Sequence, residues 1–263
     1  MLRRNIEERV TAFVFFLTIV QGHIIELRPK IVNGTTVSIK EVPFQVSLQQ
    51  WGRHFCGGSI LNHYYIITAA HCVNGKKPAM LKIIVGTENN RKAGQVYLTQ
   101  KIIMHKEYNI PLQSDRNDIA LIKLKSPLKY SNVVQPVTLP EPHAKIPARS
   151  PAIVSGWGEL GGDSKRGSDI LRKAQIWITD PINCIKAMNV EEYEIYPTQL
   201  CANDPTMRKG HCTGDSGGPL TVNGTLVGIV SWSVKDPFCA STKFPNVYTR
   251  VSEYIDWIKD NAE

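Results

Sequence analysis

Short apolar runs separated by turn-forming residues dominate the middle of the chain. The clearest runs are rich in β-branched or aromatic residues and are bounded by Gly, Pro, Asn and Asp, which is typical of strands. They lie at residues 44–49, 64–70, 81–86, 119–124, 151–158 and 226–232. This spacing favours an antiparallel sandwich or barrel over an alternation of strands and helices.

Only the end of the chain, residues 251–263, has helical spacing. Val251, Tyr254, Ile255 and Ile258 fall on one face of a helix there. We therefore predict an all-β protein with a C-terminal helix that docks on it.

A separate apolar stretch, residues 10–20, follows several basic residues at the start of the chain. It is shorter than the roughly 20 residues that a membrane-spanning helix needs, but it has the length of a signal-peptide core. We predict a signal peptide over residues 1–22, cleaved after Gly22. The mature protein is then secreted, extracellular and without a membrane anchor.

The formal net charge is +8, and 42% of the residues are hydrophobic. At 263 residues the chain can bury a full core as a single domain. A basic balance can indicate nucleic-acid binding, but the Lys and Arg residues are scattered and form no long run. We therefore expect no nucleic-acid partner.

The six cysteines are an even number in a chain predicted to be exported, which favours three disulfides. No C-x-x-C pair is present, so a zinc site is a poor alternative. Their number alone leaves about fifteen pairings open.

The most informative stretch is KGHCTGDSGGP at residues 209–219, where small residues surround Ser216. Residues 214–218 also satisfy G-x-S-x-G, the nucleophile elbow of α/β-hydrolases. Those enzymes need a histidine after the serine, and no histidine follows His211. A subtilisin-like order needs Asp before His, and the first aspartate is Asp115, so only His143 or His211 could be the base; each lies in a segment without a strand to hold it. The remaining order is His, Asp, Ser.

The candidates for the base are His54, His63, His71 and His105. His71 is the best candidate for the base, because it lies between a predicted strand and Cys72. We interpret His63 and His105 as structural.

Asp118 is the candidate acid, because it opens the apolar run 119–124, whereas Asp163 and Asp169 lie in a Gly/Ser-rich loop. A serine hydroxyl needs an imidazole to take its proton and a buried carboxylate to orient that imidazole. The backbone amides of Gly214 and Ser216 are candidates for an oxyanion hole.

These residues lie in motifs that resemble the trypsin/chymotrypsin serine proteases. The motifs are TAAHC (68–72), DIALIKL (118–124), GDSGGP (214–219), IVNG (31–34), HFCGGS (54–59), GWG (156–158) and SW (231–232). The resemblance implies two antiparallel six-stranded β-barrels with the triad His71, Asp118 and Ser216 between them. It also implies the disulfides Cys56 with Cys72, Cys184 with Cys201, and Cys212 with Cys239. No cofactor is implied.

The resemblance further implies a zymogen. Residues 23–30 are then an activation peptide and residues 31–263 the protease domain. Cleavage after Lys30 would free the α-amino group of Ile31, which in this family pairs with the carboxylate at the position of Asp215. Burial of that ion pair compensates two charges that are each costly alone.

The substrate pocket departs from the trypsin pattern. Trypsins carry an aspartate six residues before the nucleophile, and here that position is Gly210. The other pocket positions are His211, Ser231, Trp232, Ser233 and Asn246, none of which is an acid. A cationic substrate side chain would lose its solvation without a countercharge, so we expect neutral, chymotrypsin- or elastase-like specificity.

Two alternatives stay open. Asp236, in the loop after Ser233, could supply a basic preference, and a protease homologue with a closed pocket could act only as a binding partner. For an active enzyme we expect protein or peptide substrates, an activating trypsin-like protease, protease inhibitors and a monomeric state.

Two further features concern ligands on the surface. The segment at residues 86–95 contains one acid, Glu88, so we expect no calcium site and no other metal. Asn33 and Asn223 each begin an N-glycosylation sequon. Asn223-Gly224 is also a hairpin-turn signal.

Overall fold

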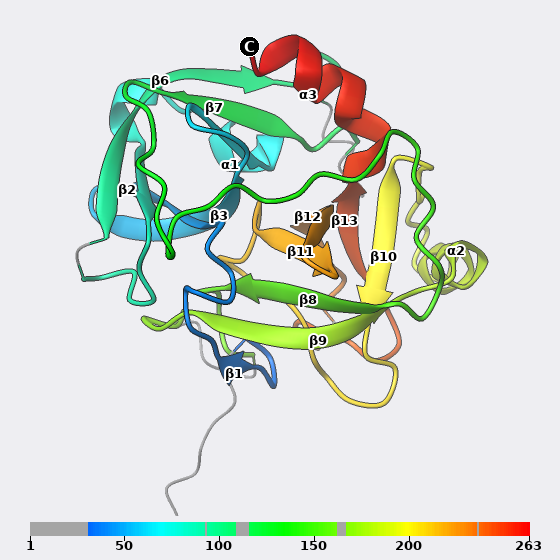
Figure 1. The fold of residues 1–263 in the computed structure, drawn as a ribbon. Helices are drawn as coiled ribbons and strands as arrows, with labels where there is room; N and C mark the ends of the chain where they lie inside the picture. The colour runs from blue at the N-terminus through cyan, green and yellow to red at the C-terminus, as the bar shows by residue number, and fades with distance from the viewer. Residues whose placement is uncertain (1–30, 93, 109–115, 162–166, 236) are drawn as a thin grey trace, which may run out of the picture.

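The computed structural model describes residues 31–92, 94–108, 116–161, 167–235 and 237–263. The predicted signal peptide, the activation peptide and Asp236 lie outside these residues. Two closed antiparallel barrels of six strands each make up the fold, as predicted. Figure 1 shows the first barrel at the upper left and the second at the lower right.

The first barrel has the strand order β2-β3-β4-β7-β6-β5 and closes by pairing β5 with β2. Its interior side chains alternate with outward ones: on β6, Tyr97 and Thr99 are buried, whereas Val96 and Leu98 are half exposed. The strands are β2 (Gln45–Gln50), β3 (Arg53–Ile60), β4 (Tyr65–Thr68), β5 (Lys82–Val85), β6 (Gln95–Met104) and β7 (Ala120–Leu124).

The second barrel has the order β9-β10-β13-β12-β11-β8, and β8 pairs with β9 to close it. A short strand, β1 (Thr35–Thr36), adds to β9 from outside. The strands are β8 (Pro151–Gly156), β9 (Arg172–Ile178), β10 (Gln199–Asn203), β11 (Pro219–Val222), β12 (Thr225–Trp232) and β13 (Asn246–Arg250).

The hairpin signal at Asn223-Gly224 is confirmed. Val222 pairs with Thr225, so Asn223 and Gly224 form a two-residue loop between β11 and β12. Both have positive φ, 50° and 79°, the backbone conformation that this tight turn requires.

The C-terminal helix is also confirmed. A 3₁₀ turn, η2 (Val251–Tyr254), leads into α3 (Ile255–Asn261), and the four residues predicted to share a face are all buried. They belong to the apolar cluster of the first barrel. The chain thus leaves the second barrel at β13, and its last helix packs against the first barrel (Figure 1).

The expectation that only the end of the chain is helical is wrong. The structure contains α1 (Ala70–Val73), the 3₁₀ turn η1 (Pro78–Met80) and α2 (Pro181–Asn189). The start of α2 carries a recognisable signal: the Asp180 side chain accepts from the backbone of Ile182 and Asn183, and Pro181 occupies the first helical position.

The structure contains three disulfides, with the pairing that the resemblance implies. Cys56–Cys72 lies in the first barrel, and Cys184–Cys201 and Cys212–Cys239 lie in the second. Direct hydrogen bonds also join the barrels, including Ser155 Oγ to Gln45 Oε1 at 2.6 Å and Gly57 N to Ser216 O at 2.7 Å. Their interface is therefore a defined contact that can hold side chains from both halves.

Candidate active site

Asp118 lies at the barrel interface, just before β7, and is only 1% exposed. Its Oδ1 accepts from the backbone N of His71 at 2.9 Å, and its Oδ2 accepts from His71 Nδ1 at 2.7 Å. Ser231 Oγ, from the second barrel, donates to the same Oδ2 at 2.6 Å. Because a buried carboxylate is costly without partners, these bonds fix both its charge and its orientation.

His71 is held by its neighbours in the chain. It lies in α1, directly after β4, and the adjacent Cys72 is joined to Cys56 on β3. Its side chain is 25% exposed, whereas that of Asp118 is fully buried. Since Nδ1 donates its proton to Asp118, the lone pair of the neutral ring lies on Nε2, which is the atom that a base needs.

Ser216 is positioned by close backbone contacts between the barrels. Its carbonyl accepts from Gly57 N, and the next residue, Gly217, packs against the end of β4. A Cβ at Gly217 would overlap Thr68 Oγ1, so only glycine permits this approach. Ser216 therefore lies beside the strand end that leads into His71.

The segment before Ser216 is anchored through His54, whose role the sequence did not indicate. His54 Nε2 lies 2.9 Å from the carbonyl oxygen of Gly214, and Nδ1 lies 2.8 Å from Ser47 Oγ. The carbonyl can only accept, so Nε2 carries the proton and Nδ1 accepts from Ser47. Burial lowers the pKa of His54 to about 4, so the ring is neutral. It holds the backbone of Gly214, one of the two candidate oxyanion residues.

Asp215 is completely buried, and its carboxylate accepts hydrogen bonds from two backbone amides. Gly158 N donates to Oδ1 at 2.7 Å and Cys212 N donates to Oδ2 at 3.0 Å. Gly156 and Gly158 leave room for it, since a Cβ on either would overlap a carboxylate oxygen. Burial raises the pKa of Asp215 to about 7, although these amide bonds oppose the rise.

Ile31 is also fully buried, in the core of the second barrel. The following residue, Val32, pairs with Gly210, whose N donates to Val32 O at 3.3 Å. The start of the predicted protease domain is thus docked against the floor of the predicted pocket. Lys30 lies before the first described residue.

The predicted pocket floor is neutral and closely packed. Gly210, His211 and Asn246 are all buried, and a Cβ at Gly210 would lie 2.5 Å from Asn246 Nδ2. The His211 ring meets the Tyr248 ring edge-on at 5.2 Å. Burial lowers the pKa of His211 to about 3, with His71 adding a smaller effect in the same direction, so its ring is uncharged.

One buried polar atom of this floor, His211 Nε2, has no hydrogen-bond partner among the described residues. Such groups are rare in proteins because each costs free energy. The floor therefore differs from the surroundings of Asp118, where the carboxylate oxygens are bonded.

The other predicted pocket residues have different positions. Ser231 directs its hydroxyl to Asp118, so its side chain belongs to the His71–Asp118 network. Trp232 and Ser233 are partly exposed, and the Trp232 ring packs against Tyr193 with centroids 5.3 Å apart. Asp236 lies outside the described residues.

The remaining histidine candidates lie away from this network. His63 Nδ1 contacts the carbonyl of Leu128 at 2.9 Å and its ring stacks on Tyr130, while His105 packs edge-on against Tyr254. Thr249 was not predicted, yet its Oγ1 donates to the backbone carbonyl of Asp118 at 2.7 Å. Nothing in its local sequence distinguishes it from a barrel residue.

Potential metal ligands gather at one place in the described parts of the chain, Cys56, His71 and Cys72. Both sulfur atoms are joined in a disulfide, so neither is available as a thiolate ligand. In the same parts of the chain, no helix is both long and apolar enough to cross a membrane.

Two six-stranded barrels with an oriented His–Asp pair at their interface are characteristic of chymotrypsin-fold serine proteases. A family model described as Trypsin matches residues 31–258, and the chain belongs to this family. It is a serine endopeptidase, a hydrolase that acts on protein substrates.

The curated relatives are similar along nearly their whole length. Trypsin-1 of Astacus astacus is 38% identical over 249 residues, which cover 88% of this chain and 100% of that protein. Trypsin epsilon of Drosophila erecta is 36% identical, covering 100% of this chain and 99% of that protein. The vitellin-degrading protease of Bombyx mori is 35% identical, covering 88% of this chain and 85% of its own length.

Proposed function

We propose that this chain cleaves peptide bonds through an acyl-enzyme, with Ser216 as nucleophile, His71 as general base and Asp118 as its orienting carboxylate. The observation that carries the proposal is the 2.7 Å contact between His71 Nδ1 and the buried Oδ2 of Asp118. It fixes the tautomer in which Nε2 can accept a proton.

The reaction follows from this tautomer. Nε2 takes the proton of Ser216 Oγ as that oxygen attacks the carbonyl carbon of the substrate, and Asp118 stabilises the imidazolium that forms. The amides of Gly214 and Ser216 stabilise the oxyanion of the tetrahedral intermediate. His71 then protonates the leaving amine, and a water molecule releases the acyl group by the same steps in reverse.

Primary specificity for a neutral side chain is supported by the pocket floor. Gly210 stands where trypsins carry an acid, Asn246 packs against it, and His211 is uncharged. An Arg or Lys side chain entering here would lose water without gaining a counterion. The relatives named trypsins do not settle this point, because specificity depends on these few side chains. Cleavage after Arg or Lys is the alternative.

Zymogen activation at Lys30 is part of the same proposal. The buried Ile31 and the buried carboxylate of Asp215 support it, since a new α-amino group would offset the cost of that charge. A Lys30→Gln variant should then resist activation by trypsin, whereas wild type should gain activity. Full activation of Lys30→Gln would show that the activating cut lies elsewhere.

Export is supported by the predicted signal peptide and by the three disulfides, which persist in oxidising compartments. We place N-glycosylation at Asn223 in preference to Asn33. Asn223 is exposed at a hairpin tip, whereas the Asn33 amide donates to Arg208 O at 2.7 Å and is already engaged.

One experiment tests activity and specificity together. After activation the trypsin is removed; one portion of the protein is labelled with an organophosphonate probe, and a second, unlabelled portion is given peptides that differ in the residue before the scissile bond. We expect Ser216 to be labelled and peptides with neutral residues to be cleaved. An unlabelled Ser216 favours the alternative of a silent homologue that only binds partners, and cleavage confined to Arg and Lys sites contradicts the neutral pocket.

A further inference from the structure

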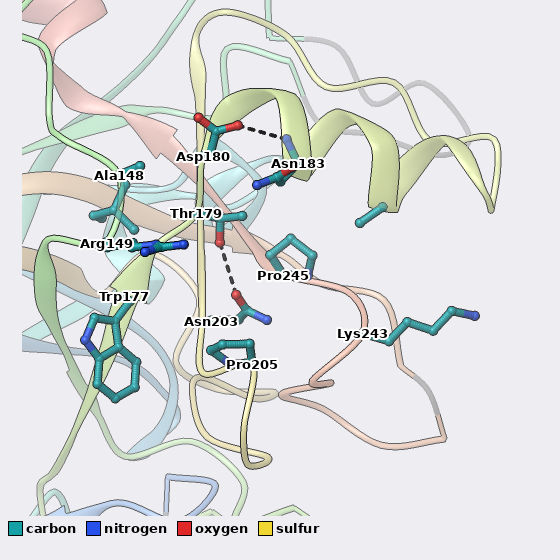
Figure 2. Close-up of a pocket in the computed structure, with 12 residues that line it drawn as sticks. Ala148, Arg149, Trp177, Thr179, Asp180, Asn183, Asn203, Pro205, Lys243 and Pro245 are labelled. Atoms are coloured by element: carbon teal, nitrogen blue, oxygen red, sulfur yellow. Dashed lines mark hydrogen bonds between the residues drawn. The ribbon is translucent and has the colours of Figure 1, made fainter.

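A second cavity of about 500 Å³ lies on the second barrel, beside the end of β9 and the start of α2. Its volume is in the range of small-molecule sites. Arg149, Trp177, Asn203 and Pro245 contribute to its walls (Figure 2). None of the residues proposed for catalysis or for the primary pocket lines it.

The backbone of Arg149 is unusual. Residues 147–150 form a turn in which Ser150 N donates to Pro147 O at 3.2 Å, and Arg149 N donates to Ile178 O at 2.8 Å. Arg149 has φ = 64°, a left-handed conformation that glycine adopts easily and other residues adopt at a cost of about 1 kcal/mol or more. An arginine stands here at a position where glycine would be more stable, which points to a role for its side chain.

The Arg149 guanidinium has no ion pair or hydrogen bond to any described residue. In Figure 2 it points toward Thr179 and Asn203, whereas the Lys243 side chain points away. Thr179 and Asn203 are bonded to each other, at 3.1 Å between Oγ1 and Oδ1. Arg149 is therefore the cation that a ligand would meet.

The acid in the wall is already engaged. Asp180 Oδ1 accepts from Ile182 N at 3.0 Å and from Asn183 N at 3.1 Å, capping α2. Its charge is stabilised by the helix N-terminus, and no hydrogen bond or ion pair joins it to Arg149 in the described chain. A free guanidinium is suited to bind a carboxylate through two parallel hydrogen bonds.

The rest of the wall is largely apolar, including Ala148, Trp177, Pro205 and Pro245. We propose that this cavity binds a carboxylate carried on an apolar body: Arg149 holds the carboxylate, and Trp177 with the two prolines packs against the apolar part. The ligand is a free organic acid or the C-terminus of a peptide, which present the same chemistry.

Binding is measured by calorimetry on the Ser216→Ala protein, so that no probe is cleaved. The probes are 3-phenylpropionate and the peptide Ala-Ala-Phe, each compared with its neutral amide. We expect each acid that binds to do so at least about tenfold more tightly than its amide, the usual effect of a charged hydrogen-bonded pair. Tighter binding of the peptide acid identifies a peptide C-terminus, and tighter binding of 3-phenylpropionate identifies a free acid.

Arg149→Gly is the decisive variant, because glycine suits the backbone there and the fold should be as stable as wild type. We expect it to abolish the preference for acid over amide, and Trp177→Ala to weaken acid and amide alike. Arg53→Ala, which removes an exposed arginine elsewhere, is the matched control and should change nothing. Equal binding of acid and amide, an unchanged preference in Arg149→Gly, or no binding in the millimolar range overturns the proposal.

Discussion

Two buried polar clusters lie close together in this protein, and they are built in opposite ways. Around Asp118, both carboxylate oxygens accept hydrogen bonds from His71 and Ser231. In the proposed pocket floor, His211 Nε2 is buried without a partner among the described residues. The hydrogen bonds of the first cluster fix one geometry, whereas the second cluster leaves a polar atom unpaired, which costs stability.

This difference matches the two tasks that we propose for the clusters. A general base must keep one tautomer and one orientation, so its surroundings must be satisfied before substrate arrives. The floor of a specificity pocket discriminates by the partners that it does not supply. A substrate is rejected when its polar or charged group finds no hydrogen-bond partner or counterion there. Changes in the two clusters should therefore have effects of different size and kind.

The largest effect is expected from Ser216→Ala and His71→Ala. Each should lower kcat by about 10⁶-fold, because the nucleophile or its base is lost and the remaining groups act as a unit. The measurement is steady-state hydrolysis of the best peptide from the specificity panel, with the thermal midpoint as a check on folding. A folded His71→Ala protein that kept most of its activity would falsify the assignment of the base.

Asp118→Asn should lower kcat by about 10⁴-fold, since an amide can no longer hold His71 with its proton on Nδ1. Ser231→Ala is the matched variant: it removes one hydrogen bond to Asp118 but leaves the carboxylate, and we expect a loss of roughly tenfold. Both are measured as kcat across pH. Equal losses in the two variants would mean that the carboxylate acts only as a packing group.

His211 should make the fold sensitive to acid. Its pKa is about 3 when folded and about 6.5 in an unfolded chain, so only the unfolded state gains a proton as pH falls below 6.5. Stability is therefore lost as pH falls from 7 toward 4, by on the order of 3 kcal/mol from this residue.

Urea unfolding at pH 7 and pH 4 measures this loss. His211→Phe keeps a ring beside Tyr248 but cannot titrate, so the difference in unfolding free energy between the two pH values should shrink by that amount. His143→Phe, at an exposed histidine paired with Glu253, is the control and should behave as wild type. A matching change in both variants would contradict the role of burial at His211.

The smallest effect concerns the pocket itself. Gly210→Asp alone should fail to create cleavage after Lys, because its Cβ would lie 2.5 Å from Asn246 Nδ2 and φ at this position is 149°. Adding Asn246→Gly removes that obstacle, and the ratio of Lys to Leu cleavage should rise by about 10²-fold. If Gly210→Asp by itself produced this change, Asn246 would not be the residue that prevents an acid at position 210 from binding Lys.

Much of the fold could be predicted from local patterns. Six apolar runs correspond to β2, β4, β5, β7, β8 and β12, and the spacing of Val251, Tyr254, Ile255 and Ile258 identified the last helix. β6 was not predicted because Val96 and Leu98 are apolar yet point outward. The alternation of apolar and polar residues that marks a half-buried strand is therefore not visible there. α2 was not predicted because its apolar residues are not all buried: Ile182 and Ile185 are exposed, whereas Cys184 and Met188 are buried.

For the site, chain order and the motifs pointed to residues far apart in the sequence. They did not reveal that His54 holds the Gly214 carbonyl, that Ser231 bonds to Asp118 or that Thr249 supports the backbone of Asp118. These are contacts between barrels or between distant strands, and a serine or histidine that makes them has no local signature.

The amino-acid sequence by itself determined the kind of protein: the strand pattern, the order of His71, Asp118 and Ser216, and the absence of an acid at Gly210 can all be read without a fold. The tertiary structure decided which polar side chains have hydrogen-bond partners. Two histidines of the same chemistry, His71 and His211, differ in their surroundings. His71 is partly exposed and hydrogen-bonded to a carboxylate, whereas His211 is buried and its Nε2 has no partner in the described parts of the chain. Desolvation and hydrogen bonding depend on neighbours that only folding brings together, so these properties lie in the tertiary structure.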